Sequence, residues 1–135
     1  MKIIVMKFGG TSVANVSKIS KIADTISKES TKFKILVVLS AMSGETNRLQ
    51  TYIDEVQSHS SKETDLIITS GEQVTIGLLS MILNKKGVKS IPLLGWQIPI
   101  VTDDNYGKGR ILNIEKKNIE NYFKSNDVIV LAGFQ

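Results

Sequence analysis

The feature that most limits the possible folds of this chain is an apolar run that does not alternate with polar residues. Residues 35–39 read Ile-Leu-Val-Val-Leu, and residues 128–131 form a second such run. A strand with one face in water alternates apolar and polar side chains, whereas an unbroken apolar run is typical of a strand covered on both faces. The sequence therefore predicts an α/β fold in which helices flank a parallel sheet.

The rest of the chain supplies further strands and amphipathic helices for such a fold. A polar stretch at residues 69–73 precedes the third helical pattern, which places Glu72 in a first helical turn, and Gly87 ends that helix. The last apolar run is expected at a sheet edge, or beside strands that are not in this chain. We predict strands at residues 3–6, 35–39, 88–94, 111–114 and 128–131, and helices at 13–26, 49–56, 74–83 and 115–123.

Composition narrows the class of protein. With 135 residues, 41% hydrophobic and 22% charged, the chain is one globular domain of ordinary composition. It has no cysteine, which removes disulfides, thiolate catalysis and zinc–thiolate sites. Its net charge of +4 comes from scattered lysines without interleaved aromatic residues, so nucleic-acid binding is not expected. No apolar run approaches membrane-spanning length and no secretory signal is evident, so we expect a cytoplasmic protein with no membrane partner.

The first loop has the residues of an anion site. A short apolar strand reaches Lys7, turns through Gly9 and Gly10, and passes Ser12 into a helical pattern. Glycine tolerates a positive φ and lets an anion approach the backbone, and amides at a helix N-terminus are unpaired donors with a positive dipole. The alternative is an ordinary tight turn with a surface lysine.

A second strand-to-helix loop, residues 40–47, is small and rich in hydroxyl groups. Because the carboxyl ends of parallel strands meet at one edge of a sheet, we expect both loops side by side, where they could hold one phosphorylated ligand. The alternative is that Ser43 or Thr46 only caps the next helix. Glu72 has two interpretations, a helix-capping carboxylate or a carboxylate that holds a substrate ammonium group. His59, the only histidine, is expected to be a solvated loop residue.

Five segments of the chain carry a family pattern: Lys7-Phe8-Gly9-Gly10-Thr11-Ser12, Ser40-Ala41-Met42, Ser70-Gly71-Glu72-Gln73, Gly95-Trp96-Gln97 with Thr102-Asp103, and Ala132-Gly133-Phe134-Gln135. In order and spacing, they resemble the aspartate kinases. The resemblance implies an amino acid kinase fold, a three-layer αβα sandwich with a mostly parallel sheet. It also implies ATP-dependent phosphorylation of the side-chain carboxylate of aspartate, with Mg²⁺ accompanying ATP, on the route to lysine, threonine, methionine and diaminopimelate.

The resemblance also implies roles for individual residues. Lys7 would neutralise charge on the transferring phosphoryl group, and Thr46 and Glu72 would bind aspartate. The acceptor is already a carboxylate and needs no strong base, so positioning and charge stabilisation suffice for catalysis. The residues expected to cradle the phosphates of ATP are Lys7, Phe8, Gly9, Gly10, Ser12 and Ser40.

The chain also departs from the family that it resembles. Residues 1–135 would form only the N-terminal part of an amino acid kinase domain, without the nucleotide-binding half or the regulatory domains. Tyr106 and Gly109 stand where the family often has histidine and alanine. Two hypotheses follow: an enzyme half that a separately encoded C-terminal half completes, or a catalytically inactive truncated remnant or interaction module. The expected protein partner is a complementary C-terminal half or a second copy in a homo-oligomer. For the isolated chain we expect a folded, self-associating unit that does not turn over ATP and aspartate.

Overall fold

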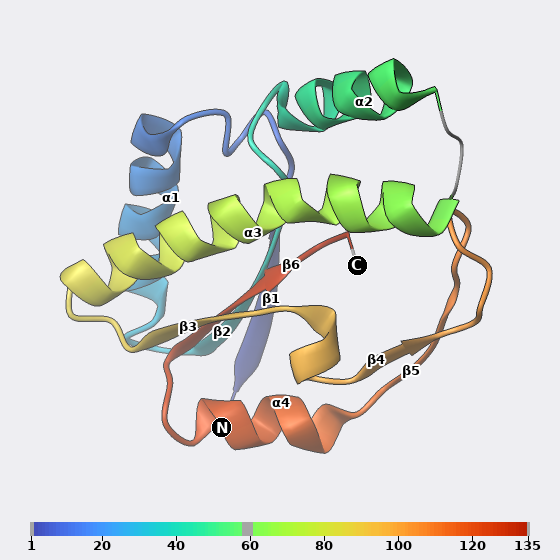
Figure 1. The fold of residues 1–135 in the computed structure, drawn as a ribbon. Helices are drawn as coiled ribbons and strands as arrows, with labels where there is room; N and C mark the ends of the chain where they lie inside the picture. The colour runs from blue at the N-terminus through green and yellow to red at the C-terminus, as the bar shows by residue number, and fades with distance from the viewer. Residues whose placement is uncertain (1, 58–60, 135) are drawn as a thin grey trace.

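The computed structural model describes residues 2–57 and 61–134, which form an α/β fold (Figure 1). The elements, in chain order, are β1 (Ile3–Phe8), α1 (Val16–Glu29), β2 (Lys34–Leu39), α2 (Glu45–Val56), α3 (Ser61–Lys85), β3 (Ser90–Leu93), the 3₁₀ turn η1 (Gly95–Gln97), β4 (Ile100–Thr102), β5 (Ile111–Ile114), α4 (Lys116–Phe123) and β6 (Val128–Ala132).

Four strands form one parallel sheet with the order β1-β2-β6-β3, as the unalternating runs predicted. The prediction that the last strand lies at an edge or lacks neighbours is wrong. The segment that contains η1, β4, β5 and α4 returns the chain to the middle of the sheet, so β6 pairs with β2 on one side and β3 on the other. All five residues of β6 are buried. The edge strands are β1 and β3.

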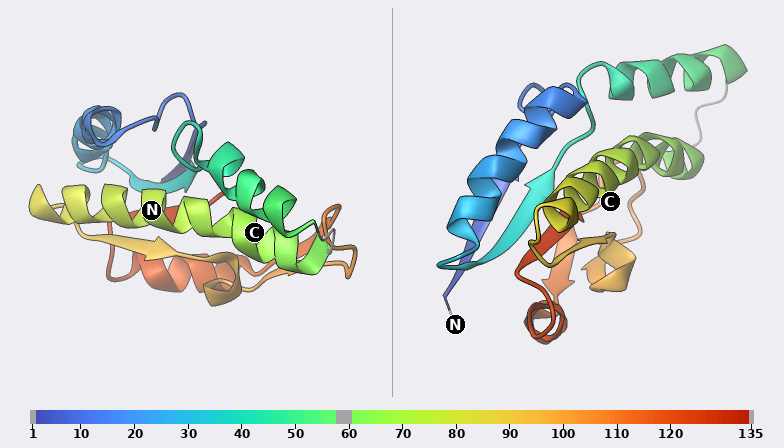
Figure 2. Two further views of the ribbon diagram at one scale, coloured as in Figure 1. Left: turned by 45° about the horizontal axis from the view of Figure 1, so that its top comes forward. Right: turned by 90° about the vertical axis from the view of Figure 1, so that its left-hand side faces the viewer.

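The two faces of the sheet carry separate apolar clusters. Alternate residues of β2 and β6, such as Val37 and Val130, pack with α1 and α3, while Ile129 and Leu131 face the other way and pack with Phe123 of α4. Figure 2 shows α1 and α4 on opposite sides of the strands. This arrangement agrees with the αβα sandwich that the sequence predicted.

The third helix is longer than the sequence predicted. Residues 61–85 form one continuous helix, so the polar stretch 69–73 lies in its interior and Glu72 is not in a first turn. Within the helix, the hydroxyls of Thr69 and Ser70 donate to carbonyl oxygens one turn earlier, so these polar side chains have partners without a break in the helix. At its other end, Asn84 exchanges hydrogen bonds with the backbone of Ser90, which anchors α3 to β3.

By length and composition alone, α3 is apolar enough to cross a membrane, which the shorter helix predicted from the sequence was not. Its apolar side chains Ile76, Leu79 and Leu83 are nevertheless buried in the cluster between α1, α3 and the sheet. An apolar core helix passes the same compositional test. The packing identifies α3 as a core helix of this fold.

Strands β4 and β5 form a separate antiparallel pair that the sequence did not predict as a unit. The loop between them is held by Asp103, whose Oδ1 accepts hydrogen bonds from the amides of Asn105 and Arg110. Asp65 of α3 accepts a hydrogen bond of 2.7 Å from the amide of Gly107. This contact ties the tip of the hairpin to the N-terminal half of α3.

Candidate functional site

Three loops at the carboxyl ends of β1, β2 and β6 meet around one cavity of about 520 Å³. Gly10 comes from the first loop, Ser40 and Thr46 from the second, and Phe134 from the segment after β6. Glu72 of α3 closes the cavity from the side of the helices. The sequence-based prediction that the first two loops lie side by side at one sheet edge is confirmed.

The first loop approaches the second closely at Gly10. A Cβ atom placed there would lie 3.1 Å from the carbonyl oxygen of Ala41, so a side chain at this position would press on the backbone of the second loop. The expected conformational reason is wrong, because neither Gly9 nor Gly10 has a positive φ. Small size, rather than left-handed geometry, is what this contact requires.

The helix also starts later than expected. Ser12 and Val13 donate to the carbonyl of Gly9 in a turn, and α1 begins only at Val16, where Asn15 caps it by accepting from the amide of Lys18 at 2.9 Å. The N-terminus of α1 therefore does not directly follow the two glycines. Within residues 2–57 and 61–134, the amides of Gly10 and Thr11 donate to no protein group, so they are the available donors of this loop.

The second loop turns into α2 at Gly44. This residue is the N-cap of α2 with φ 81°, a left-handed conformation that favours glycine, and no side chain caps the helix. The alternative that Ser43 or Thr46 is the helix cap is therefore wrong. Thr46 instead stands in the first turn of α2, where it is exposed and lines the cavity.

Glu72 is the buried acidic group of the site, with 6% of its surface exposed. Its Oε2 accepts a hydrogen bond of 2.5 Å from the amide of Phe134. The amides of Ala41 and Gly133 also lower the pKa of the carboxyl group, although the Gly133 amide donates to the carbonyl oxygen of Leu39 at 2.8 Å. Burial raises the pKa of Glu72, and the three amides partly oppose this shift by stabilising the charged form. The carboxylate thus joins α3 to the loops after β2 and β6.

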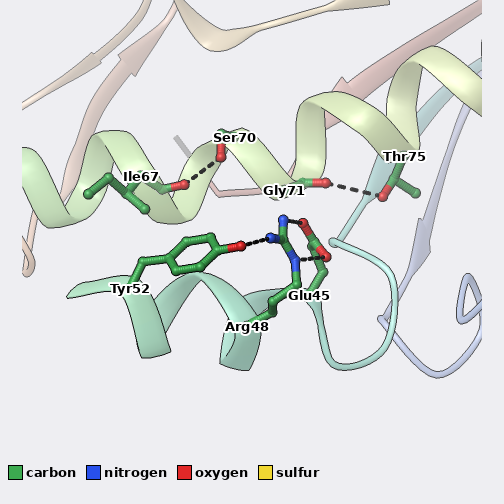
Figure 3. A network of polar contacts seen from close by, with 7 residues as sticks. All are labelled: Glu45, Arg48, Tyr52, Ile67, Ser70, Gly71 and Thr75. Carbon is green, nitrogen blue, oxygen red and sulfur yellow. Dashed lines mark hydrogen bonds and ion pairs between the residues drawn. The ribbon is translucent and has the colours of Figure 1, made fainter. Parts of the chain in front are cut away.

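Gly71 lets α3 lie close against α2. A Cβ atom on Gly71 would lie 3.1 Å from Cγ of Glu45 and 3.2 Å from Cδ1 of Leu49, both on α2. Figure 3 shows Gly71 of α3 beside α2, where the Arg48 guanidinium bridges Glu45, at 2.6 Å, and the hydroxyl of Tyr52, at 2.7 Å. The ion pair holds the pKa of Glu45 below its usual value, chiefly through the hydrogen bond from Arg48.

Four of the sequence-predicted site residues lie outside the cavity. Lys7 is exposed near the end of β1, on the sheet face opposite to α1 and α3, and Gly9 and Ser12 are exposed in the loop. The side chain of Phe8 packs against the main core. Only its backbone contacts the second loop, through a carbonyl oxygen that accepts a hydrogen bond from the amide of Ser40. The expectation for His59 falls on a residue outside the described ranges.

Sequence reasoning missed the partners of Glu72. The segment Ala132-Gly133-Phe134 was noted only as part of a resemblance, and nothing in its sequence shows that the amide of Phe134 holds a carboxylate. One signal was present in Gly133, since glycine after a buried strand often marks a close backbone approach. A Cβ atom there would lie 3.1 Å from the carbonyl oxygen of Leu39.

A parallel sheet with a cavity beyond the carboxyl ends of its strands, into which a buried carboxylate and a few hydroxyl residues converge, defines an α/β protein of the ligand-binding type. The sequence model described as "Amino acid kinase family" matches residues 2–135, and the chain belongs to that family. This confirms the membership that the sequence motifs predicted.

The individual relatives are aspartate kinases. The chain is 46% identical to the aspartate kinase of Pseudomonas fluorescens (strain SBW25) and 43% identical to the aspartokinase of Rickettsia felis. Both alignments cover 100% of this chain, but only 34% and 35% of the relatives. The chain therefore spans about a third of the length of these curated relatives.

Solved structures agree on the fold. The aspartate kinase from Synechocystis matches with a TM-score of 0.78 at 30% identity, over 98% of this chain and 21% of that one. E. coli aspartokinase III in complex with aspartate and ADP also gives a TM-score of 0.78, at 20% identity over 97% of this chain and 40% of that one. At 20% identity, the match to E. coli aspartokinase III shows that the two proteins share a fold.

Proposed function

We propose that this chain provides the aspartate-binding and phosphate-facing part of an ATP-dependent aspartate kinase. The observation that carries the proposal is the cavity in which Gly10, Ser40, Thr46 and Glu72 meet, because the resemblance to the aspartate kinases implies a binding role for each of these residues. The names of the relatives support the choice of aspartate as the acceptor. The protein would act in amino-acid biosynthesis, in the cytoplasm.

In the proposed reaction, a side-chain carboxylate oxygen of aspartate attacks the γ-phosphorus of ATP. A new bond forms between this oxygen and the γ-phosphorus, while the bond between the γ-phosphorus and the oxygen that bridges it to the β-phosphorus breaks. The products are aspartyl phosphate and ADP, which keeps the bridging oxygen. The acceptor is ionised at neutral pH, so no base must remove a proton. The protein contributes by holding the two substrates and by stabilising the charge on the phosphoryl oxygens.

Each part of the cavity has a role in this proposal. The free amides of Gly10 and Thr11, with Ser40 behind them, would donate to phosphate oxygens, joined by Gly9 and Ser12 at the loop surface. Thr46 would hydrogen-bond the aspartate. Glu72 would hold the aspartate ammonium group, with its carboxylate kept in place by the amides of the flanking loops.

Lys7 would act from the other side of the sheet edge. It is exposed and makes no ion pair within the described ranges, so its charge is free to meet phosphate. Its distance from the cavity means that ATP would bridge the edge of the sheet, with its γ-phosphate towards Glu72 and Thr46. The proposed contact is therefore electrostatic stabilisation by a solvent-facing ammonium.

Mg²⁺ would enter with ATP. Among the residues that the structure describes, no group of three His, Cys, Asp or Glu side chains could hold a metal ion. Mg²⁺ commonly keeps several waters and binds through substrate phosphates with one or two carboxylates, so a protein cage is not needed. The residues therefore fit delivery of the ion on the nucleotide.

The test uses a chimera in which this chain replaces the matching third of the Pseudomonas fluorescens aspartate kinase. Binding of L-aspartate is measured by titration calorimetry for the parent chimera and for Glu72→Gln. Loss of the ammonium partner should weaken binding by about 2 kcal/mol. The matched control is Glu120→Gln on the surface of α4, which should bind like the parent. Equal affinities in all three proteins would assign Glu72 a purely structural role.

A further inference from the structure

Three side chains of α2 form a hydrogen-bonded row on the side of the helix that faces α3 (Figure 3). The Arg48 guanidinium grips both carboxylate oxygens of Glu45, with Nη2 donating to Oε1 at 2.6 Å and Nε donating to Oε2 at 3.0 Å. Its Nη1 donates to the hydroxyl of Tyr52 at 2.7 Å, and the guanidinium lies over the Tyr52 ring, 5.2 Å from its centre. A planar fork that is held at both ends keeps the Glu45 carboxylate in one orientation.

This pair differs from an ordinary surface ion pair. Lys116 and Glu120 on α4 make one contact of 3.5 Å, and their side chains are 83% and 47% exposed. The Glu45 side chain is only 22% exposed, and its contact with Arg48 is bidentate. Isolated surface pairs hold side chains weakly, whereas a bidentate pair with a covered carboxylate has a defined geometry. Position, more than stability, is therefore what the Glu45–Arg48 pair supplies.

Glu45 packs against the helix that carries Glu72. A Cβ atom on Gly71 would lie 3.1 Å from Cγ of Glu45 and 3.3 Å from Cβ of Ala41. The amide of Ala41 stabilises the charged form of Glu72. The stem of Glu45 thus lies where α2, the loop after β2 and α3 meet, beside the residue that precedes Glu72.

Glu45 also directly precedes Thr46 in the first turn of α2. A helix turns by about 100° per residue, so two neighbouring side chains point in different directions. Glu45 packs on Gly71, and Thr46 lines the cavity. The N-cap is Gly44, which has no side chain with which to fix this turn. A change in how Glu45 is held would therefore redirect Thr46.

We propose that the ion pair of Glu45 and Arg48 positions the aspartate site by fixing the first turn of α2 against α3. The turn carries Thr46 and α3 carries Glu72, so the pair sets how far apart these two aspartate-binding groups lie. Neither Glu45 nor Arg48 lines the cavity, so both are positioning residues that do not touch the substrate. The choice of aspartate as the ligand rests on the proposed function.

The charge of the pair matters as well as its geometry. With Arg48 in place, the charges of Glu45 and Arg48 cancel beside the site. Without Arg48, the carboxylate of Glu45 would stand unpaired next to Gly71, and aspartate brings two carboxylates of its own. Because like charges repel, loss of Arg48 alone harms aspartate binding through both orientation and charge.

The chimera tests this inference by titration calorimetry with L-aspartate and, separately, with ATP. Arg48→Gln should weaken aspartate binding by about tenfold, because a small misplacement of Thr46 removes a contact from the ligand. ATP binding should change by less than about twofold, since the amides of Gly10 and Thr11 lie on the first loop. Lys116→Gln, which removes the exposed pair of α4, is the matched control and should bind both ligands like the parent.

A double variant tests whether Arg48 acts through Glu45. The combination of Glu45→Gln and Arg48→Gln removes the carboxylate that Arg48→Gln alone leaves unpaired, so it should bind aspartate at least as tightly as the single variant. Weaker binding by the double variant would show that the two residues act independently, which would contradict the inference.

Hydrogen exchange in the isolated chain tests the structural step without any ligand. Arg48→Gln should accelerate exchange by about threefold at the amides of Leu49 and Gln50, because the turn that carries their acceptors is held less firmly. The amide of Ile19, which donates to the carbonyl of Asn15 at 3.0 Å, is the internal control in α1. Unchanged exchange in α2 would show that the ion pair does not hold the turn and would overturn the proposal.

The outcomes of the titrations separate this inference from the proposed function. If the parent chimera binds aspartate and Arg48→Gln binds it equally well, the inference is wrong and the proposed function stands. An equal loss of affinity for aspartate and ATP would also overturn the inference, since it would indicate general damage to the fold. A folded parent chimera that binds no aspartate would contradict the proposed function and, with it, the role of the pair in positioning an aspartate site.

Discussion

Oε2 of Glu72 accepts a hydrogen bond of 2.5 Å from the amide of Phe134, which joins the middle of α3 to the segment that follows the central strand β6. The amide of Ala41 brings the loop after β2 to the same carboxylate. Three elements that are distant in sequence are therefore held by one side chain. A carboxylate fixed in this way is oriented before any ligand arrives, which lowers the ordering cost of binding.

Glu72→Ala should loosen the loops that the carboxylate holds. The substitution removes the acceptor of the part-buried Phe134 amide, and loss of one such hydrogen bond costs about 0.5–1.5 kcal/mol. Hydrogen exchange should accelerate at Phe134 and Ala41. Exchange at Ser90, whose amide donates to Asn84, serves as the internal control. Unchanged protection at Phe134 would contradict the structural part of the account.

The pH dependence of stability should differ between Glu72→Gln and the parent chain. Burial raises the pKa of Glu72 in the folded state above its ordinary value of 4.5, so the folded state holds the proton more tightly than the unfolded state. As the pH rises from 4.5 through the folded pKa, the ionised carboxylate becomes a cost that glutamine does not have. The stability of the variant relative to the parent should therefore increase with pH over this range.

Thermal melts of both proteins between pH 4.5 and 7.5 measure this difference in stability. Other titrating groups affect the stability of both proteins equally, so their effects cancel in the difference. Asp24 and Glu45 have lowered pKa values, chiefly through hydrogen bonds from Lys86 and Arg48, and they remain in both proteins. Their stabilising effects weaken as the pH falls and cancel in the comparison. A difference in melting temperature that does not vary with pH would show that Glu72 has no raised pKa.

Gly71→Ala should destabilise the fold, whereas Gly77→Ala in the same helix should not. The new methyl group at residue 71 would press on Glu45 and Leu49 of α2, and such overpacking costs about 1–3 kcal/mol. Residue 77 has open space, so alanine there should stabilise α3 by up to about 1 kcal/mol. Urea unfolding of the two variants measures both effects. Equal midpoints would contradict the close packing of α2 on α3.

The sheet could be predicted because its central strands are unbroken apolar runs that are visible in the local sequence, such as residues 35–39 in β2. The continuity of α3 could not, because the back-bonding of Thr69 and Ser70 is not visible as a pattern. The central position of β6 also depends on a long connection through η1, the hairpin and α4, which periodicity does not describe.

For the site, the motifs brought the right loops together but gave an incomplete picture of each residue. Gly10 was singled out for its backbone freedom, yet its closeness to Ala41 requires its lack of a side chain. Glu72 was assigned to a helix start because only local sequence was considered, and its partners Gly133 and Phe134 lie beyond β6. Contacts of this range depend on the tertiary fold.

Lys7→Ala should abolish phosphoryl transfer in the chimera without harming the fold. Loss of one group that stabilises transition-state charge costs about 100-fold or more in kcat. Because Lys7 is exposed and unpaired within the described ranges, its removal should change the free energy of unfolding by less than about 0.5 kcal/mol. Lys2→Ala, at an exposed lysine just before β1, is the matched control and should keep its activity. Retained activity in Lys7→Ala would show that Lys7 does not contact phosphate.

The central claim is that this chain carries part of an aspartate kinase site and needs further polypeptide to complete it. The most direct measurement is formation of aspartyl phosphate from ATP, Mg²⁺ and L-aspartate, trapped with hydroxylamine, for the isolated chain and for the chimera side by side. We expect steady product formation by the chimera and none by the isolated chain. Steady formation by the isolated chain, or none by a chimera whose folding circular dichroism confirms, would contradict the account.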